Sequence, residues 1–342
     1  MQKEFNIGKR KIHFFTKKCF VIAEIGVNHL GNFQLCKKLI DLAAKSGADA
    51  VKLQTINADE SYVIGTESYK IFKNKHLTDE EMFNLSRFTK SKKLEFFSTP
   101  GDFSSLEKLL KLNVDAIKIS SGLLTNIPLI EAAAKSKKPL IVSTGMGKES
   151  DIENAFNAAK KNGCKKLGIL KCTSLYPAPD ETLNLNGISA LKKKFSVPIG
   201  YSDHSLDDLA PISAVSMGAT IIEKHFTSSN KLKGADHKIS MLPKNFLLMV
   251  QKIRRIEKML GKKKISPHPK EMPEAFKKHR YIVAKKNLQK NDKIDLNTVA
   301  FKRLKVNSKS ALMPIFFKKI KNKKVNKIIK KNNIIKINYL KK

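Results

Sequence analysis

The stretch VPIGYSDHSLDDLAPISAVSMGATIIEKHF, residues 197–226, contains the pattern that decides the fold. It begins with one apolar run, VPIGYSD (Val197–Asp203), and ends with another, ATIIEKHF (Ala219–Phe226), with a helical segment between them. His204 and His225 stand at the ends of these runs, 21 residues apart. That separation is the length of one β–α unit, so we expect both imidazoles at the same end of a parallel sheet.

Six similar runs precede this stretch, and helical patterns such as FQLCKKLIDLAAKSG (residues 33–47) separate them. The six are FVIAEIG (Phe20–Gly26), ADAVKLQT (Ala48–Thr55), LEFFSTP (Leu94–Pro100), DAIKIS (Asp115–Ser120), LIVSTG (Leu140–Gly145) and KLGILKCTS (Lys166–Ser174). Near-continuous apolar runs are typical of parallel strands that are buried on both faces. Eight such units in about 240 residues predict an α/β fold, a (β/α)8 TIM barrel. A doubly wound open sheet is the alternative, but no GxGxxG follows the first run.

The composition fits a folded enzyme. Hydrophobic residues make up 41% of the 342 residues, which is enough for a large core. We find neither an apolar stretch long enough to span a membrane nor the features of a signal peptide at the N-terminus. The four cysteines lack CxxC spacing, which favours a reduced, cytoplasmic location.

The charge allows a second class of function. Lysine and arginine number 67 against 30 acidic residues, a formal net charge of +37, which is compatible with nucleic-acid binding. The basic residues are mostly lysines spread along the whole chain, as drift toward A/T-rich codons would produce, whereas a polyanion site would concentrate arginine and aromatics on one face. We therefore do not expect a nucleic-acid partner. Only KKIKNKKVNKIIKKNN (Lys318–Asn333) keeps a non-catalytic, RNA-associated role open.

The pattern changes after about residue 260. The segment KKKISPHPKEMPEAF holds three prolines and no periodicity, which predicts a linker over residues 261–278. Short strand-like pieces follow, including YIVAKKNLQKNDKI and VAFKRL. We therefore expect a barrel over residues 1–260 and a small β-rich domain over residues 279–342, which is too short to be very stable alone.

Polar side chains gather at the ends of the apolar runs, where the strands of a barrel present its active site. They are Glu24, Lys52, Gln54, Thr99, Lys118, Ser121, Ser143, Ser174, Tyr176, His204 and His225. Burying an unpaired ammonium is costly, so lysines within apolar strands (Lys52, Lys118 and Lys171) suggest a functional site better than chance polarity does.

Two kinds of chemistry follow from these residues. Two imidazoles on adjacent strand ends can hold a divalent metal such as Mn²⁺ or Mg²⁺, which would act as a Lewis acid on a carbonyl oxygen. Lysines that converge with several hydroxyls suit a phosphate and a carboxylate held together; the hydroxyls are those of Ser121, Ser143, Thr144 and Ser174. Glu24 and Asp236 could bind sugar hydroxyls, and Glu24 could also move a proton or pair with Lys52. The simpler alternatives are loop histidines, helix-capping hydroxyls and a turn-forming aspartate.

Nine motifs occur in the order and spacing of the sialic acid (N-acetylneuraminate) synthase family, which includes legionaminate and pseudaminate synthases, and the chain resembles that family over residues 8–260. The motifs are AEIGVNHLG, VKLQT, FFSTP, KISSG, STGMG, CTSLYPAP, GYSDHS, EKHFT and GADHKIS. The last segment is similar to the family's antifreeze-protein-like (SAF) domain. The resemblance implies a transferase that condenses phosphoenolpyruvate with an N-acetylated amino-sugar aldehyde, and a domain-exchanged homodimer.

The resemblance also implies roles for single residues. His204 and His225 match the family's metal ligands, and Lys52, Lys118, Ser121, Ser143 and Ser202 match its phosphoenolpyruvate contacts. The residues that match amino-sugar contacts are Glu24, Gln54, Tyr176 and Asp236. Arg303, in FKRL, matches an arginine that enters the partner's site and meets the N-acetyl group.

Three positions depart from the family pattern: Leu123 replaces a common acidic residue, Ser174 a common Asn, and Gly101 a bulky residue. These changes affect the identity of the acceptor sugar more than the type of reaction. CTSLYPAP is closer to legionaminate and pseudaminate relatives, while GYSDH and DHKIS are closer to legionaminate or sialate synthases. An aldolase with a Schiff base on Lys118 or Lys171 is a further alternative.

Overall fold

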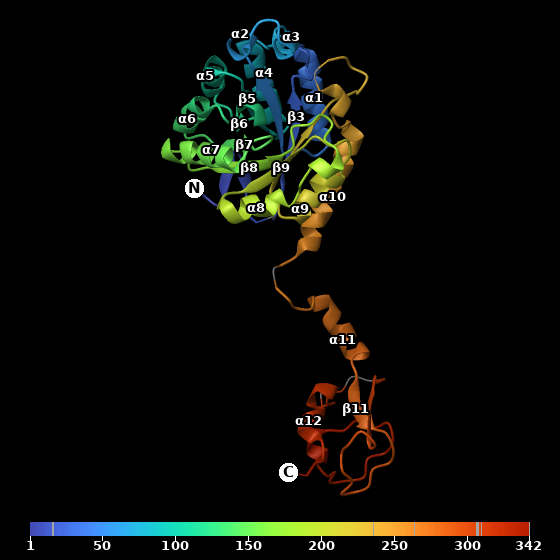
Figure 1. Cartoon of the computed structure of the whole chain (residues 1–342). Coiled ribbons are helices and arrows are strands. Elements are labelled where there is room, and N and C mark those ends of the chain that lie inside the picture. Colours follow the sequence, from blue (N-terminus) through green and yellow to red (C-terminus); the bar gives the residue numbers. More distant parts are fainter. Residues whose placement is uncertain (16, 235, 263, 306–307, 309, 342) are drawn as a thin grey trace. The chain divides into compact units, whose positions relative to one another are not determined.

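Eight parallel strands close into a barrel in the first part of the chain (Figure 1). In the computed structural model, which describes all residues except 16, 235, 263, 306–307, 309 and 342, two compact units are distinct, Met1–Gly261 and Lys262–Lys342. The barrel strands are β3 (Phe20–Gly26), β4 (Ala50–Thr55), β5 (Glu95–Pro100), β6 (Ile117–Ile119), β7 (Leu140–Ser143), β8 (Leu167–Cys172), β9 (Ile199–Asp203) and β10 (Ile221–His225). The predicted (β/α)8 barrel is therefore confirmed, with every strand inside the run that predicted it.

Helices surround the barrel (Figure 1), and their apolar side chains pack in the same core as those of the strands. They are α1 (Phe33–Lys45), α4 (Asp79–Ser91), α5 (Phe103–Lys111), α6 (Ile127–Lys135), α7 (Glu149–Lys161), α8 (Gly187–Lys194), α9 (Leu209–Ser216) and α10 (Pro243–Leu260). Side chains cap several of them; Thr78 and Glu81, for example, form a capping box at the start of α4. Two short helices that we did not predict, α2 (Ala58–Ser61) and α3 (Glu67–Phe72), lie between β4 and α4 in the sequence.

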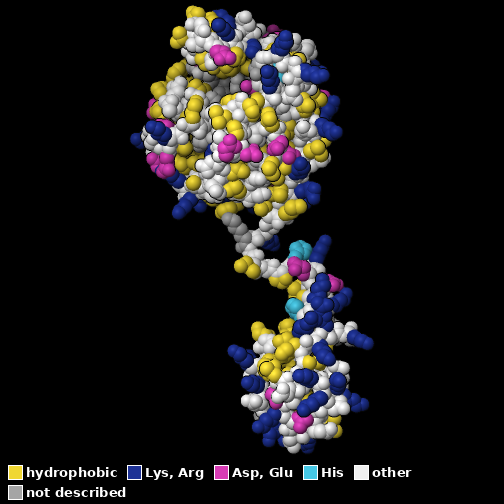
Figure 2. Space-filling model, turned by 45° about the vertical axis from the view of Figure 1, so that its right-hand side comes forward, with side chains coloured by type: hydrophobic (Ala, Val, Ile, Leu, Met, Phe, Trp, Pro, Cys, Tyr) yellow, Lys and Arg dark blue, Asp and Glu magenta, His cyan; other side chains and the backbone are white. Residues whose placement is uncertain are grey.

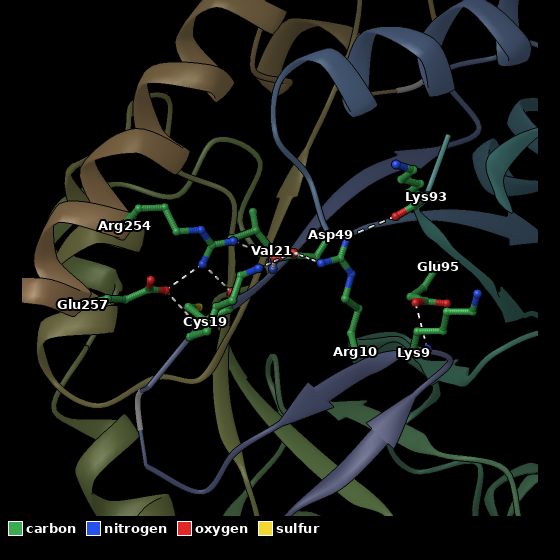
Figure 3. A network of polar contacts seen from close by, with 10 residues as sticks. Lys9, Arg10, Cys19, Val21, Asp49, Lys93, Glu95, Arg254 and Glu257 are labelled. Carbon is green, nitrogen blue, oxygen red and sulfur yellow. Dashed lines mark hydrogen bonds and ion pairs between the residues drawn. The ribbon is translucent and has the colours of Figure 1, made fainter. Parts of the chain in front are cut away.

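A polar network secures the end of the barrel where the strands begin (Figure 3). Asp49 is its centre: its carboxylate accepts hydrogen bonds from the Val21 amide (3.1 Å) and from Arg254 of α10 (2.7 Å). Arg10 approaches the same carboxylate to 3.6 Å. Arg10 belongs to an N-terminal hairpin of β1 (Phe5–Ile7) and β2 (Arg10–Ile12), which we did not predict. The network thus joins the hairpin, the sheet and the last barrel helix.

The second unit has its own small core, which includes Ile282, Leu288 and Ile335. It contains α11 (Met272–Lys278), the antiparallel pair β11 (Tyr281–Ala284) and β12 (Val299–Lys302), and α12 (Phe317–Ile320). Helix α11 lies within the segment that we expected to be an irregular linker. Its residues 272–278 follow a proline-containing turn, and Pro273 stands in the first turn of the helix, where the missing amide hydrogen is tolerated.

The positive charge is not evenly distributed along the chain, contrary to our expectation. Residues 262–342 hold 26 of the 67 lysines and arginines but only four of the 30 acidic residues. Lysine and arginine side chains cover much of the face of this unit that Figure 2 presents. No helix in the described part of the chain has the length and apolar character needed to cross a membrane.

Candidate active site

Three of the predicted residues form a row across neighbouring barrel strands. His225 of β10 is the ladder partner of Glu24 of β3, and Glu24 is the ladder partner of Lys52 of β4. All three side chains are buried. Because strand ends converge at the mouth of a barrel, the register alone brings an imidazole, a carboxylate and an ammonium side by side.

Two lysines and two glutamates form a buried charged cluster beside this row. Lys52 Nζ lies 2.6 Å from Glu24 Oε2 and 3.8 Å from Glu223 Oε2. Lys118 Nζ lies 3.7 Å from Glu223 Oε1 and donates to the Ser143 hydroxyl at 2.6 Å. Each ammonium therefore has a carboxylate partner, which is the condition under which buried charges are tolerated.

Hydroxyl groups complete the cluster. Ser202 Oγ donates to Glu223 Oε1 at 3.0 Å, and Lys52 donates to Thr99 Oγ1 at 3.3 Å. Both hydroxyls belong to predicted site residues and both residues are buried. The cluster therefore joins strands β3, β4, β5, β6, β7, β9 and β10 through side chains alone.

The two glutamates have different pKa values because their surroundings differ. Burial and the nearby Glu223 charge raise the pKa of Glu24 to about 8. Burial would also raise the pKa of Glu223, but Lys118, Lys52 and the hydrogen bond from Ser202 outweigh it and lower that pKa. Two carboxyl groups with separated pKa values are an arrangement suited to a proton donor and a proton acceptor.

The lysines also differ from each other. Burial lowers the pKa of Lys118, and the nearby Lys52 charge acts in the same direction. Burial acts to lower the pKa of Lys52 as well, but Glu223 and Glu24 outweigh it and the pKa rises. Lys52 therefore keeps its positive charge at neutral pH. An added anion would stabilise the charged form of Lys118 more than that of Lys52.

The loop after β7 leaves a small space at Gly145, which the hydroxyl groups of Ser121 and Ser174 line. We call this space the serine cradle. Gly145 follows β7 with φ +46°, and a Cβ atom there would lie 2.2 Å from Ser121 Cβ and 2.5 Å from Ser174 Oγ. Ser174 Oγ is buried and has no hydrogen-bond partner. A buried hydroxyl without a partner costs free energy, so a ligand oxygen at this position would be stabilising.

The two predicted metal-binding imidazoles lie together at the mouth, with ring centroids 5.4 Å apart. His204 Nδ1 is 2.6 Å from the backbone carbonyl of Thr173, to which it donates, so Nε2 of the neutral ring keeps its lone pair. His225 Nδ1 is buried without a hydrogen-bond partner. Burial lowers the pKa of His225 well below its usual value, with the neighbouring His204 adding to the effect. Burial acts to lower the pKa of His204 as well, but Cys172 and the hydrogen bond to the Thr173 carbonyl outweigh it and raise that pKa. A metal ion would bind the neutral form of both rings.

The donor set tests whether a divalent cation fits. Within the described residues, no cluster of three or more His, Cys, Asp or Glu side chains is arranged to hold a metal. Two imidazoles would therefore leave several coordination positions to water or substrate, as catalytic metal sites require. The orphaned His225 nitrogen and the oriented His204 ring fit such a cation.

Two of the residues predicted to contact the sugar, Tyr176 and Asp236, lie against the imidazoles. The Tyr176 ring lies 4.1 Å from the His204 ring, centroid to centroid, and is half exposed. Asp236 Oδ2 lies 3.6 Å from His225 Nδ1, and burial raises the pKa of Asp236. Gln54 is the ladder partner of Thr99 and follows Lys52 on the same face of β4. Tyr176 is thus the exposed member of this group, while Gln54 and Asp236 are partly buried.

Lys171, a strand lysine discussed above, is not part of this cluster. Lys171 Nζ bonds the Cys172 carbonyl (3.0 Å) and the Thr173 hydroxyl (3.3 Å), and its aliphatic chain lies beside Gly187 at the start of α8. Our expectation that Lys171 would converge on the mouth was wrong, because the side chain lies on the outer side of β8. Arg303 is exposed and follows β12 in the second unit.

The positions that depart from the family pattern have local explanations. Leu123 packs against the barrel core and offers no ligand. Gly101 allows the segment after β4 to approach β5, because a Cβ atom there would lie 2.8 Å from Ile56 and 2.9 Å from Ser61 Oγ.

Sequence reasoning missed two site residues. Glu223 stands two positions before His225 in IIEKH, and the period of two that defines a strand face could have found it. Cys172 Sγ lies 3.5 Å from Ser121 Oγ and 3.8 Å from His204 Nδ1. The apolar character of a cysteine in the run GILKC gave no signal.

These features define a class: a (β/α)8 barrel with a charged, hydroxyl-lined candidate active site at the carboxyl ends of its strands. Residues 39–265 match the model of the NeuB family. The chain belongs to the NeuB family.

Known relatives agree with this membership. The chain is 39% identical to N,N'-diacetyllegionaminic acid synthase of Legionella pneumophila over 81% of this chain and 83% of that protein. It is 35% identical to pseudaminic acid synthase of Campylobacter jejuni over 73% of this chain and 77% of that protein. The crystal structure of N-acetylneuraminic acid (sialic acid) synthetase from Leptospira borgpetersenii, in complex with citrate, superposes with a TM-score of 0.76 at 38% identity, covering 80% of this chain and 95% of that one.

Proposed function

We propose that this protein is a nonulosonic acid synthase that condenses phosphoenolpyruvate with an N-acetylated amino-sugar aldehyde and releases phosphate. The observation that carries the proposal is the convergence of two buried lysines and a serine cradle opposite a pair of imidazoles. Family membership supports the reaction type.

The donor subsite follows from charge. Phosphoenolpyruvate carries a phosphate and a carboxylate, and Lys52 and Lys118 supply two positive charges for them. Ser121, Ser143 and the unpartnered hydroxyl of Ser174 add hydrogen-bond donors. Gly145 leaves the space in which a phosphate oxygen would meet these hydroxyls.

The acceptor subsite lies on the histidine side. A divalent cation held by His204 and His225 would supply Lewis-acid polarisation of the acceptor's aldehyde oxygen. Tyr176 and Asp236 lie against the two rings and would orient the sugar, together with Gln54. The phosphoenolpyruvate C3 atom then forms a bond to the aldehyde carbon.

Proton transfers are assigned to the two glutamates. Glu24, with its pKa raised to about 8, holds a proton at neutral pH and gives it to the former aldehyde oxygen. Water adds at C2 of the donor, and Glu223, whose pKa is lowered, accepts the proton that the water loses. The C2–O bond to phosphate then breaks, and the new C2 hydroxyl gives its proton to the leaving phosphate as the keto group forms. The lysines stabilise the leaving phosphate.

For the acceptor, we infer a 2,4-diacetamido-6-deoxy hexose, which would give N,N'-diacetyllegionaminate. The greater identity with the legionaminic acid synthase than with the pseudaminic acid synthase supports this choice. N-Acetylmannosamine, which would give N-acetylneuraminate, and the pseudaminate precursor are the competing acceptors.

The reaction is tested by phosphate release with each acceptor in turn, with and without Mn²⁺ or Mg²⁺. Phosphate release that requires phosphoenolpyruvate, an acceptor and metal, together with a product mass equal to the nine-carbon acid, supports the proposal. If no acceptor of the panel causes phosphate release with any divalent metal, the proposal is wrong.

We also infer that two copies of the chain exchange their second units, so that Arg303 meets the acceptor's N-acetyl group in the partner's site. Apolar side chains at the barrel mouth, such as Leu206 and Met146, and Phe301 near Arg303 are exposed and would be covered in such a dimer. Mixing His225→Gln and Arg303→Ala chains tests it. Heterodimers with an exchanged unit regain one intact site and therefore activity, whereas mixed chains with self-contained sites stay inactive.

A further inference from the structure

An oppositely charged pair, Asp203 and Lys224, directly precedes the two histidines in the sequence. Asp203 stands before His204, and Lys224 stands before His225. Their side chains are completely buried, at 0% exposure each, and Lys224 Nζ lies 2.5 Å from Asp203 Oδ2. Neither residue was predicted to serve the site.

The pair lies on the opposite face of the sheet from the charged cluster. Side chains alternate between the faces of a strand, and Ser202 and Glu223, one position earlier in each strand, bond each other on the inner side. Asp203 and Lys224 are themselves ladder partners across β9 and β10. The ion pair therefore joins the two strands at the level from which both imidazoles project.

The same pair holds the loop that carries His204. Asp203 accepts hydrogen bonds from the Ser205 amide (3.1 Å) and the Ser205 hydroxyl (2.8 Å). Lys224 Nζ donates to the Ser205 carbonyl. The amide, hydroxyl and carbonyl groups of Ser205, the residue after His204, are thus all bound to the pair. The chain cannot move at Ser205 without breaking several buried contacts.

Stability alone does not explain such a pair. Replacing a buried ion pair by apolar residues of similar volume often leaves a protein as stable as before, because the desolvation of both charges offsets their attraction. What the pair supplies that apolar side chains do not is directional bonds, which fix a strand-to-loop geometry. The geometry fixed here is the separation of the two histidines.

We propose that Asp203 and Lys224 are positioning residues that set the distance and orientation of His204 and His225 for a shared divalent cation. The inference rests on the metal site of the proposed function. Residues behind the direct ligands of a metal commonly contribute to its affinity by orienting those ligands.

The test measures Mn²⁺ binding to the full-length chain by electron paramagnetic resonance of the free ion, without substrates or turnover. In the double variant Asp203→Leu/Lys224→Met no unpaired charge remains buried. We expect its dissociation constant for Mn²⁺ to rise about 10–100-fold. Phosphoenolpyruvate affinity, measured by calorimetry without metal, should stay unchanged, because the lysine cluster lies on the inner side of the sheet.

A matched control comes from the other end of the barrel. Asp49→Leu/Arg254→Met removes a second ion pair (2.7 Å), in which Asp49 is buried and Arg254 is partly exposed. This pair lies where the strands begin (Figure 3), at the opposite end of the barrel from the histidines. We expect it to lower thermal stability and to leave Mn²⁺ affinity unchanged. If the two double variants change Mn²⁺ affinity equally, or if neither does, the positioning role is overturned.

Two further variants, His225→Gln and Ser205→Ala, test the metal site itself and replace a double variant that does not fold, respectively. If the unaltered chain and His225→Gln bind Mn²⁺ equally weakly, the metal site itself is wrong and the inference fails with it. If the Asp203 and Lys224 double variant does not fold, Ser205→Ala serves instead: it removes only the Oγ bond to Asp203. A several-fold weaker Mn²⁺ affinity at unchanged melting temperature supports the proposal, and unchanged affinity overturns it.

Discussion

Replacing Glu223 by glutamine tests the charged cluster most directly. The glutamate carboxylate lies 3.7 Å from Lys118 Nζ and 3.8 Å from Lys52 Nζ. Glutamine keeps the shape of the side chain and can still accept the Ser202 hydrogen bond. The substitution therefore removes one negative charge from a fully buried site and changes little else.

The distances give the size of the effect. Two unit charges at these separations attract by roughly 4 kcal/mol at an effective dielectric constant of about 20. The attraction is offset in part because burying the carboxylate is itself costly. Removal of one partner from a buried pair costs about 3–5 kcal/mol. We expect Glu223→Gln to lower the free energy of unfolding by about that amount, mostly through Lys118, which is left without a carboxylate partner.

Urea unfolding with and without phosphoenolpyruvate measures the effect. A bound anion replaces the missing charge, so we expect phosphoenolpyruvate to stabilise Glu223→Gln more than the unaltered chain. The control is Glu257→Gln, which breaks an ion pair with Arg254 at 2.6 Å outside the site and should gain nothing extra from the anion. An unchanged free energy of unfolding, or equal stabilisation of both variants, would refute the reasoning.

Three more predictions follow from the structure. The folded chain keeps a proton on Glu24 up to about pH 8, whereas an unfolded chain releases it near pH 4.5. The free energy of unfolding therefore falls as the pH rises between these two values. Glu24→Gln should remove that fall, as urea unfolding at a series of pH values would reveal. Gly145→Ala should raise KM for phosphoenolpyruvate at least about tenfold, because its Cβ meets Ser121 at 2.2 Å and φ is +46°; steady-state kinetics at saturating acceptor measure this. Asp49→Ala should lower the free energy of unfolding by about 3–5 kcal/mol with kcat unchanged, as chemical denaturation and activity assays of one preparation would reveal.

The sequence predicted the barrel because its strands are buried on both faces, and such strands produce long apolar runs. The same property hid the orientation of side chains. In KLGILKCTS an apolar run without alternation does not say which residues face inward, and Lys171 was placed at the mouth for that reason. The hairpin β1–β2 was missed because strands of three residues, FNI and RKI, carry no periodicity.

The candidate site was predicted in large part from positions at strand ends. His204, His225, Lys52 and Lys118 lie together as expected. Glu223 was missed because the predicted site residues stand at or past the end of each run, whereas Glu223 lies one layer deeper in β10. The Asp203–Lys224 pair was hidden for a different reason: nothing in a sequence tells which two buried charges are ladder partners.

The register of the sheet also supports the role that we propose for Glu24, which is to give a proton to the former aldehyde oxygen. Neighbouring strands are about 4.8 Å apart, so His225 and Lys52, two strands apart, are separated by about 10 Å at the backbone. Glu24 stands between them in the same row. In the proposed reaction, an acceptor aldehyde on the histidine side and a donor on the lysine side would form their new bond within that interval. A carboxyl group that is protonated at neutral pH, and that lies between the two sides, would reach the oxygen that becomes a hydroxyl without any movement of the strands.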